Sequence, residues 1–283
     1  MKEIYKAAER AFLEIPEDFR DWATVRVAEY FLQFGPNHGF KTPKGRWWGR
    51  KIMDDWYHGG TTPLSEFARG LFDGFNFNFE GLENLPRETA EILVVNQPNT
   101  GPLRGNWFKF LVNYAVAESR GRLGNYEACW VQGEISDSPV FRNTPIGIQK
   151  RRLSRMINKS CNTILVGSSQ KDSKNPIIEM RRHLRDSGVL VICPEGKDSA
   201  VLLRGKKEVG ELLLYLLQRT NIPIRPAAAW CGGTNLNLQF GKRIDLSSVD
   251  VNGGQKVADL AMIEIARLLP RDRRGVYQKI TDK

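Results

Sequence analysis

The feature that most constrains the fold is an alternation of short apolar runs with amphipathic segments, which begins near residue 75. Six runs have the length and residue types of buried strands: 92–95, 128–132, 163–166, 189–193, 224–229 and 236–240. Helix-like segments lie at 107–118, 150–158, 176–186, 208–219 and 256–269. This alternation predicts an α/β fold, with a mixed, mostly parallel sheet covered by helices.

The chain divides into two parts near residue 75. Residues 75–79 alternate phenylalanine with asparagine, a pattern typical of a half-buried strand at the start of the α/β domain, which we place at 75–283. Residues 1–74 form a predicted helical N-terminal segment. An apolar stripe along residues 19–34 either packs on the rest of the protein or lies on a membrane surface.

Charge and aromatic residues suggest an acidic partner. The sequence has 42 Lys and Arg against 32 Asp and Glu, a formal charge of +10. Residues 41–51 combine five basic residues with Trp47 and Trp48 and contain no acid. Such a segment suits an anionic lipid headgroup layer, although a solvated loop whose tryptophans are buried in the core gives the same pattern. Anionic lipid, acidic carrier protein and nucleic acid are all compatible with the net charge.

The cysteines and the hydropathy bear on the compartment. The four cysteines are widely separated, so no close pair predicts a metal or redox site. The longest apolar run, 212–217, is far shorter than the ~20 residues that cross a bilayer. The first residues lack the apolar core of a secretory signal. We therefore expect a cytoplasmic protein that associates peripherally with the inner face of the membrane.

The turn that follows the strand-like run 189–193 is the part of the sequence that says most about function. It reads Pro194-Glu195-Gly196-Lys197-Asp198-Ser199 and leads into basic residues and a helix-like segment. A Pro-Glu-Gly turn at a sheet edge offers a carboxylate and backbone N–H groups to a polar ligand. A plain strand-to-helix connection is the alternative reading.

Several blocks in order resemble the glycerolipid acyltransferase family, which includes the 1-acylglycerol-3-phosphate acyltransferases. The blocks are 79–86, the strand 91–96, the Pro-Glu-Gly turn and 222–229, and the tail 265–277 is similar to endings of bacterial members. The resemblance covers about residues 75 to 277. It implies acyl transfer from an acyl thioester, supplied by acyl carrier protein or coenzyme A, to a lysophospholipid-type hydroxyl, with no bound cofactor or metal.

The first block departs from the family. Members carry Asn-His, four residues and Asp, where the histidine is the general base and the aspartate orients it. Here Gln97 follows Asn96 at the histidine position and Pro102 stands at the aspartate position. A carboxamide has no useful proton affinity near neutral pH, so Gln97 cannot act as this base. The resemblance therefore implies a degenerate catalytic motif.

The other blocks supply candidate substrate-binding residues. Ser168 falls where the family has a phosphate-binding arginine, while Lys197 stands at a family threonine. The resemblance implies that Glu195 accepts hydrogen bonds from a glycerol hydroxyl and that the Gly196 N–H meets a phosphate oxygen. Arg204, with neighbouring lysines and the basic segment 150–159, is placed at the cleft mouth. The candidate substrate-binding set is Asn96, Ser168, Glu195, Gly196, Lys197 and Arg204.

The histidines offer no obvious replacement base. His58 lies in a glycine-containing stretch before the matched region, and His183 lies on a basic helix where surface exposure is expected. We expect an acyltransferase-like protein with an anionic membrane surface, a lysophospholipid-like acceptor and acyl carrier protein as partners. The alternative is a catalytically inactive protein that binds lipid or acyl carrier. Nucleic acid is not expected, because charge is its only support.

Overall fold

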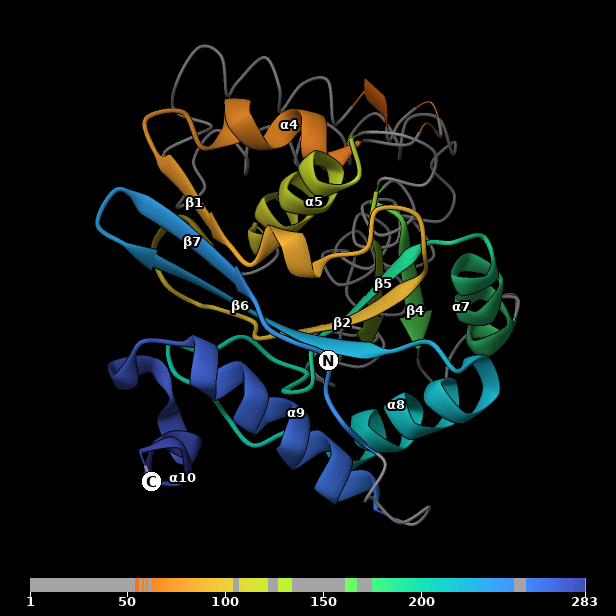
Figure 1. The fold of residues 1–283 in the computed structure, drawn as a ribbon. Coiled ribbons are helices and arrows are strands. Elements are labelled where there is room, and N and C mark those ends of the chain that lie inside the picture. Colours follow the sequence, from red (N-terminus) through yellow and green to blue (C-terminus); the bar gives the residue numbers. More distant parts are fainter. Residues whose placement is uncertain are drawn as a thin grey trace, which may run out of the picture.

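The computed structural model describes residues 54–55, 58, 60, 63–103, 107–121, 127–133, 161–166, 175–246 and 253–282. Within them, one seven-stranded sheet has the order β1-β7-β6-β2-β5-β3-β4 (Figure 1). The pairing is parallel except between β6 and β7, which run antiparallel. This confirms the predicted α/β fold with a mixed, mostly parallel sheet. The strands are β1 (Asn76–Glu80), β2 (Glu91–Val95), β3 (Cys129–Gly133), β4 (Thr163–Val166), β5 (Val189–Ile192), β6 (Ile224–Gly232) and β7 (Asn235–Phe240).

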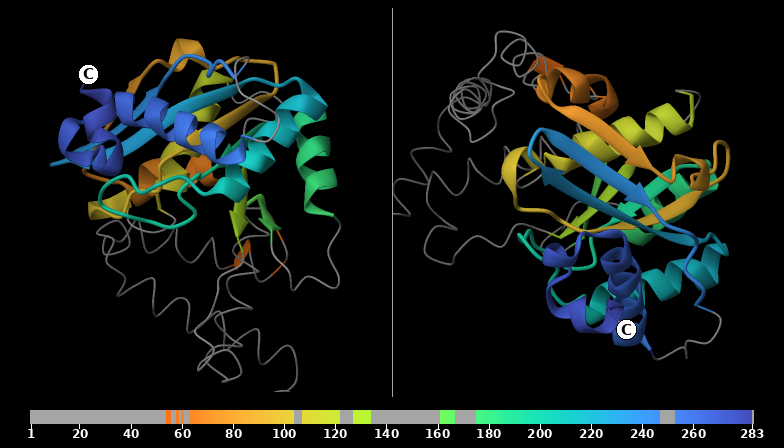
Figure 2. Two further views of the ribbon diagram at one scale, coloured as in Figure 1. Left: turned by 90° about the horizontal axis from the view of Figure 1, so that it is seen from below. Right: turned by 60° about the vertical axis from the view of Figure 1, so that its left-hand side comes forward.

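Helices cover both faces of the sheet, as the views in Figures 1 and 2 show. The helices α4 (Leu64–Leu71) and α5 (Phe108–Ser119) lie on one face. The helices α7 (Pro176–Arg185), α8 (Lys207–Thr220) and α9 (Gly254–Leu268) lie on the other, where the short α10 (Gln278–Thr281) follows α9. Single 3-10 turns occur at Leu82–Asn84, Gly101–Leu103, Arg271–Arg273 and Gly275–Tyr277.

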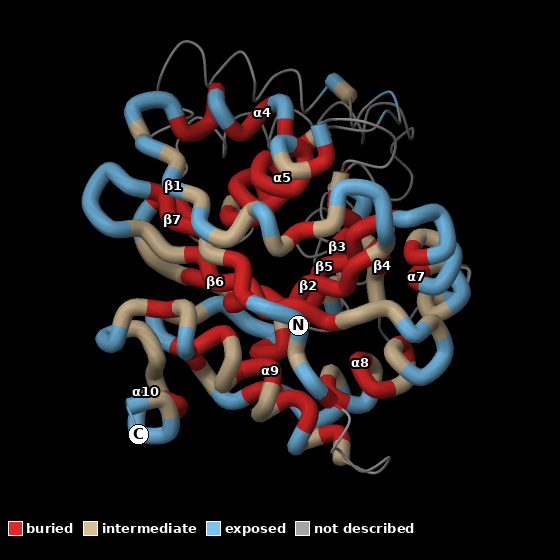
Figure 3. Tube along the Cα trace, in the orientation of Figure 1, coloured by how far each residue is buried: buried red, intermediate tan, exposed pale blue. Residues whose placement is uncertain are grey.

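Two apolar cores flank the central strands. All five residues of β2 are buried, and so are all four of β5, because helices cover both of their faces (Figure 3). Alternate residues of β2 belong to different cores: Leu93 and Val95 face α4 and α5, whereas Ile92 and Val94 face the α8 and α9 layer. The continuous apolar runs in the sequence therefore mark doubly covered strands.

The edge strand β1 behaves differently. Phe77 and Phe79 are half-buried, whereas Asn76, Asn78 and Glu80 are exposed. This confirms the half-buried strand that the alternation predicts. The sheet edge is reinforced by paired amides, since the Asn78 side chain donates to Asn237 Oδ1 at 3.0 Å across the parallel β1–β7 pair.

The predicted elements match the structure closely wherever it describes them. The strand 163–166 and the helices at 107–118 and 176–186 agree to within one residue at each end, while β6 continues to Gly232. Helix α4, which precedes the predicted boundary at residue 75, contributes Phe67 and Leu71 to the α5-side core. The predicted helices before residue 35 and at 150–158, and the Trp47–Trp48 segment, lie outside the described residues.

None of the helices in the described ranges combines the length and apolarity needed to cross a bilayer.

Candidate functional site

The candidate site lies at the carboxyl ends of β2 and β5, which are neighbours in the sheet. The chain leaves β2 toward α5 on one face and leaves β5 toward α8 on the other (Figure 1). Such a divergence of neighbouring connections is where open α/β sheets form ligand-binding crevices. The two loops are paired beyond the strands, because Ser199 N donates to Gln97 O at 3.0 Å and Asn99 N donates to Ser199 O at 2.8 Å.

Glu195 ties these loops together. Its Oε2 accepts a hydrogen bond from the backbone N–H of Gln97 at 2.9 Å, and its Oε1 accepts one from Leu203 N–H at 2.8 Å. The residue is only 2% exposed. Burial raises the pKa of Glu195 to about 7, although the two backbone donors act in the opposite direction. The carboxylate thus holds the turn against the first block, and its predicted contact with a glycerol hydroxyl stays a prediction.

The residues of the first block lie at the end of β2. None of Asn96, Gln97 and Pro102 has an ionisable side chain. Gln97 is half-buried, and Pro102 is buried within the 3-10 turn Gly101–Leu103. The Asn96 carboxamide cross-links β2 to β6, since it accepts from Ala229 N at 2.7 Å and donates to Ala229 O at 2.9 Å. The positions of the family dyad therefore provide neither a base nor an orienting carboxylate.

Gly196 has a conformational reason to be glycine. Its φ is +65°, and a Cβ at this position would approach Lys206 Nζ to 2.7 Å. Its N–H, which the resemblance assigns to a phosphate oxygen, donates to Cys193 O at 3.1 Å within the turn. Lys197 is exposed, and the exposed Arg204 lies 3.4 Å from the carboxylate of Asp259. Ser168 and the basic segment 150–159 lie outside the described residues.

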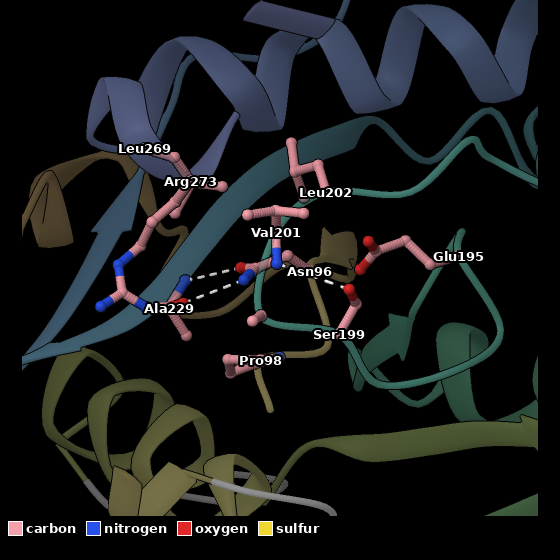
Figure 4. Close-up of a pocket in the computed structure, with 10 residues that line it drawn as sticks. Asn96, Pro98, Glu195, Ser199, Val201, Leu202, Ala229, Leu269 and Arg273 are labelled. Carbon is pink, nitrogen blue, oxygen red and sulfur yellow. Dashed lines mark hydrogen bonds between the residues drawn. The ribbon is translucent and has the colours of Figure 1, made fainter. Parts of the chain in front are cut away.

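A small hollow adjoins Glu195 on the α9 side. It has room for about one water-sized group, with an enclosed volume of about 10 Å³. In the view of Figure 4, Arg273 lies on one side of the hollow, Glu195 on the other and Asn96 between them. The lining residues are Asn96, Pro98, Glu195, Ser199, Ala200, Val201, Leu202, Ala229, Leu269 and Arg273.

Arg273 is a site residue that the sequence did not reveal. It comes from the C-terminal 3-10 turn, and its guanidinium donates to Thr100 Oγ1 at 3.0 Å and to Cys231 O at 2.9 Å. Its backbone is also fixed, because Leu202 N donates to Arg273 O at 3.0 Å. One of several arginines in a basic tail carries no local signal of this position, which only the tertiary structure creates.

Lys109 is a second unforeseen residue, on the α5 side of the same edge. Its Nζ donates to Gln132 Oε1 at 2.7 Å and lies 5.2 Å from the centre of the Trp130 ring. The side chain is buried, and burial lowers the pKa of Lys109 to about 8, against an opposite effect of the nearby Cys161 and Cys193 thiols. An ammonium in an apolar core is unfavourable without a carboxylate partner.

Neither described histidine lines the hollow beside Glu195. His58 is exposed and bonds Asp54 O at 2.9 Å. His183 is half-buried, which corrects the expected surface exposure: its Nε2 lies 3.1 Å from Val189 O at the start of β5, the opposite end from Glu195. Desolvation lowers the pKa of His183. His183 therefore does not replace the missing base at the carboxyl edge.

The described residues contain no group of three or more His, Cys, Asp or Glu arranged to hold a metal ion.

The likenesses that comparison with known proteins finds for this chain are to solved structures. No family model and no curated protein matches the chain. Among solved structures, the chain is similar to the 1-acyl-sn-glycerophosphate acyltransferase PlsC of Thermotoga maritima, with 16% identity over 93% of this chain and 97% of that chain and a TM-score of 0.46. At this identity and TM-score, we base the functional proposal on the chain's own residues.

Proposed function

We propose that this protein is an acyltransferase of the glycerolipid type with a degenerate motif. It moves an acyl group from a thioester of coenzyme A or acyl carrier protein to the hydroxyl of a lysophospholipid-like acceptor. The observation that carries the proposal is the 2.9 Å bond from Gln97 N–H to Glu195. It joins two segments, 98 residues apart, whose sequences separately resemble successive blocks of that family.

Catalysis at this edge relies on positioning. Gln97 cannot take the proton of the acceptor hydroxyl, and no histidine of the described residues lines the hollow beside Glu195. Holding a thioester and a hydroxyl in contact accelerates acyl transfer without a dedicated base: the hydroxyl oxygen forms the new C–O bond, the C–S bond breaks, and the hydroxyl proton passes to the departing thiolate. We therefore expect turnover that is slow compared with an enzyme that keeps the histidine.

A second candidate is a protein that binds acyl chain and headgroup without turnover. The specific observation that favours it is the loss of both dyad partners, since Pro102 is buried in a turn and offers no acceptor side chain to orient a base. The binding surface at β2 and β5 is unaffected by that loss.

Thiol release separates the two candidates. Purified protein is mixed with long-chain acyl-coenzyme A or acyl carrier protein, with and without lysophosphatidate, and free thiol is followed over time. The proposal predicts acceptor-dependent release that Glu195→Ala abolishes, because the paired loops separate, and that His58→Ala leaves unchanged. Lipid binding without any release supports the non-catalytic candidate. In that case Gln97→Ala alters lipid affinity alone.

Membrane association belongs to the same proposal. A formal charge of +10 and the tryptophan-containing basic segment 41–51 suit an anionic leaflet, here the inner face of the cytoplasmic membrane. Sedimentation with vesicles tests this. Binding to phosphatidylserine-containing vesicles that weakens with salt supports it, and equal binding to neutral phosphatidylcholine vesicles contradicts it.

A further inference from the structure

Arg273 carries a charge that no described carboxylate neutralises. Its guanidinium donates to the neutral oxygens of Thr100 and Cys231, at 3.0 and 2.9 Å. The other arginines of the same segment differ, because Arg271 and Arg274 both pair with Asp282, at 2.9 and 3.3 Å. A guanidinium offers five N–H donors in a planar fork, so these two bonds leave donors for a further acceptor.

The Arg273 guanidinium is held in place before any ligand arrives. Thr100 belongs to the loop after β2, Cys231 lies near the end of β6, and Leu202 in the loop after β5 binds the Arg273 backbone. Three segments from the carboxyl edge thus hold Arg273, two through its side chain and one through its backbone, and the residue lines the hollow opposite Glu195 (Figure 4). Little side-chain entropy remains to be lost when such an arginine binds an anion.

Asn99 provides a second, independent observation. Its Oδ1 is buried and accepts no hydrogen bond within the described part of the chain. A buried acceptor without a donor is unfavourable, and a ligand hydroxyl would supply that donor. Asn99 directly precedes Thr100, the residue that holds the Arg273 guanidinium. The loop that holds the cation therefore also carries a buried acceptor for a hydroxyl.

The size of the hollow limits what enters it. About 10 Å³ accommodates a single oxygen-sized group, so the bulk of a ligand remains at its mouth. A phosphate monoester beside a free hydroxyl meets these conditions: the phosphate oxygens are acceptors for a guanidinium fork, and the hydroxyl is a donor for Asn99. Glycerol phosphate and the headgroup of a monoacyl phospholipid share this chemistry.

We propose that Arg273 is the phosphate-binding residue of this protein and that it holds a phosphate monoester carrying an adjacent hydroxyl, the hydroxyl bonding to Asn99. This inference rests on the proposed function for the identity of the acceptor. The resemblance places a phosphate-binding arginine at the position of Ser168, and the C-terminal segment supplies the guanidinium from a different part of the chain.

Matched charge variants test the site in the full-length protein. Arg273→Gln removes the guanidinium at the hollow, and Arg271→Gln removes one charge from the same turn away from it. Dissociation constants are measured calorimetrically for glycerol 3-phosphate and glycerol, and for lysophosphatidate and monoacylglycerol. Arg273→Gln is expected to raise the dissociation constants of both phosphate ligands about tenfold or more, because charge-assisted hydrogen bonds are lost. Arg271→Gln is expected to change these dissociation constants by less than about twofold.

Two further variants test the site if the Arg273→Gln protein does not fold. Thr100→Val removes one tether of the guanidinium and keeps its charge, and Asn99→Asp places a negative charge beside the phosphate. Both are expected to weaken the binding of phosphate ligands. Thr100→Val, which keeps the Asn99 acceptor, is also expected to leave monoacylglycerol binding unchanged, with circular dichroism confirming the fold of both variants.

The outcomes separate this inference from the proposed function. Wild-type protein that binds neither phosphate ligand, or Arg273→Gln protein that binds them as tightly as wild type, overturns the inference even if thiol is released. Arg273-dependent binding without thiol release supports the phosphate site and contradicts acyl transfer. If Arg273→Gln weakens the binding of lysophosphatidate but not of glycerol 3-phosphate, Arg273 does not recognise the phosphate. That result overturns the inference and indicates an effect on the lipid-binding surface.

Discussion

At the scale of single residues, the site contains buried ionisable groups that a purely structural core would avoid. Glu195 and Lys109 are both almost fully buried, and desolvation opposes the charged form of each. Glu195 is compensated by two backbone N–H donors, and Lys109 by Gln132 and the face of Trp130. Each group therefore makes the stability of the fold depend on pH, and the two dependences have opposite signs.

Glu195 is expected to lower the stability as the pH rises. Its pKa is about 7 in the folded protein against an ordinary value of 4.5, so the folded state binds more protons between these two pH values. The stability that this group contributes is present below pH 4.5 and is lost as the pH rises to 7, by on the order of 3 kcal/mol. Urea unfolding at pH 5, 6, 7 and 8 should show a steeper decline for wild type than for Glu195→Gln. Parallel curves would contradict the raised pKa.

Lys109 is expected to have the reverse effect. Its folded-state pKa of about 8 lies below the ordinary value of 10.5, so the destabilisation of the fold by the buried ammonium is complete below pH 8 and disappears toward pH 10.5. Lys109→Met removes the penalty but also the bond to Gln132, so we expect a net gain of about 1–2 kcal/mol at pH 7. Urea unfolding measures this. The exposed Lys207→Met serves as control, and a less stable Lys109→Met protein would contradict a desolvation penalty that exceeds what the contacts with Gln132 and Trp130 contribute.

At the scale of elements, the packing of α8 on α9 positions the C-terminal segment. A Cβ on Gly210 of α8 would lie 1.8 Å from the carbonyl oxygen of Gly254 in α9. The segment after α9 then returns to the loop beyond Glu195, where Gly205 N donates to Tyr277 Oη at 3.1 Å and Tyr277 Oη donates to Asp259 Oδ1 at 2.9 Å. Close packing of α8 on α9 and these two hydrogen bonds of Tyr277 together bring Arg273 to the carboxyl edge.

Gly210→Ala tests the close packing. In an open helix this change stabilises by up to about 1 kcal/mol, but here the methyl group meets backbone that must move. Overpacking of this kind is unfavourable by about 1–3 kcal/mol, so we expect a net loss of about 1–2 kcal/mol in urea unfolding. Gly133→Ala is the control, because a Cβ there meets nothing within 4 Å. Equal stability of the two variants would contradict the close α8–α9 approach.

At the scale of the whole molecule, the sequence predicts the elements better than their arrangement. Strand β2 was predictable because β-branched and apolar residues fill it, and α7 because its proline and its periodicity are local signals. The order of the sheet was not predictable, since β1 pairs with β7 across about 160 residues of chain, as the Asn76–Asn235 register shows. Local patterns carry no information about such distant pairing.

The same limit applies to the candidate site. Glu195 and Gln97 were predicted through a family resemblance, and the structure brings them into contact. Arg273 and Lys109 were missed because their roles depend on partners far away in the sequence, Thr100 and Gln132. Lys109 also lies in a helix that is buried over most of its residues, so an amphipathic pattern could not distinguish it from a surface lysine.

The most direct test of the account is hydrogen–deuterium exchange of the full-length protein with and without lysophosphatidate. The account predicts that added lipid slows exchange in peptides covering residues 96–100, 195–203 and 271–277, which meet at the carboxyl edge. It predicts no change near Glu91 and Arg225, an ion pair with 3.3 Å between Nε and Oε1 at the opposite ends of the strands. Protection confined to other peptides, or none at saturating lipid, would contradict a lipid site at β2 and β5.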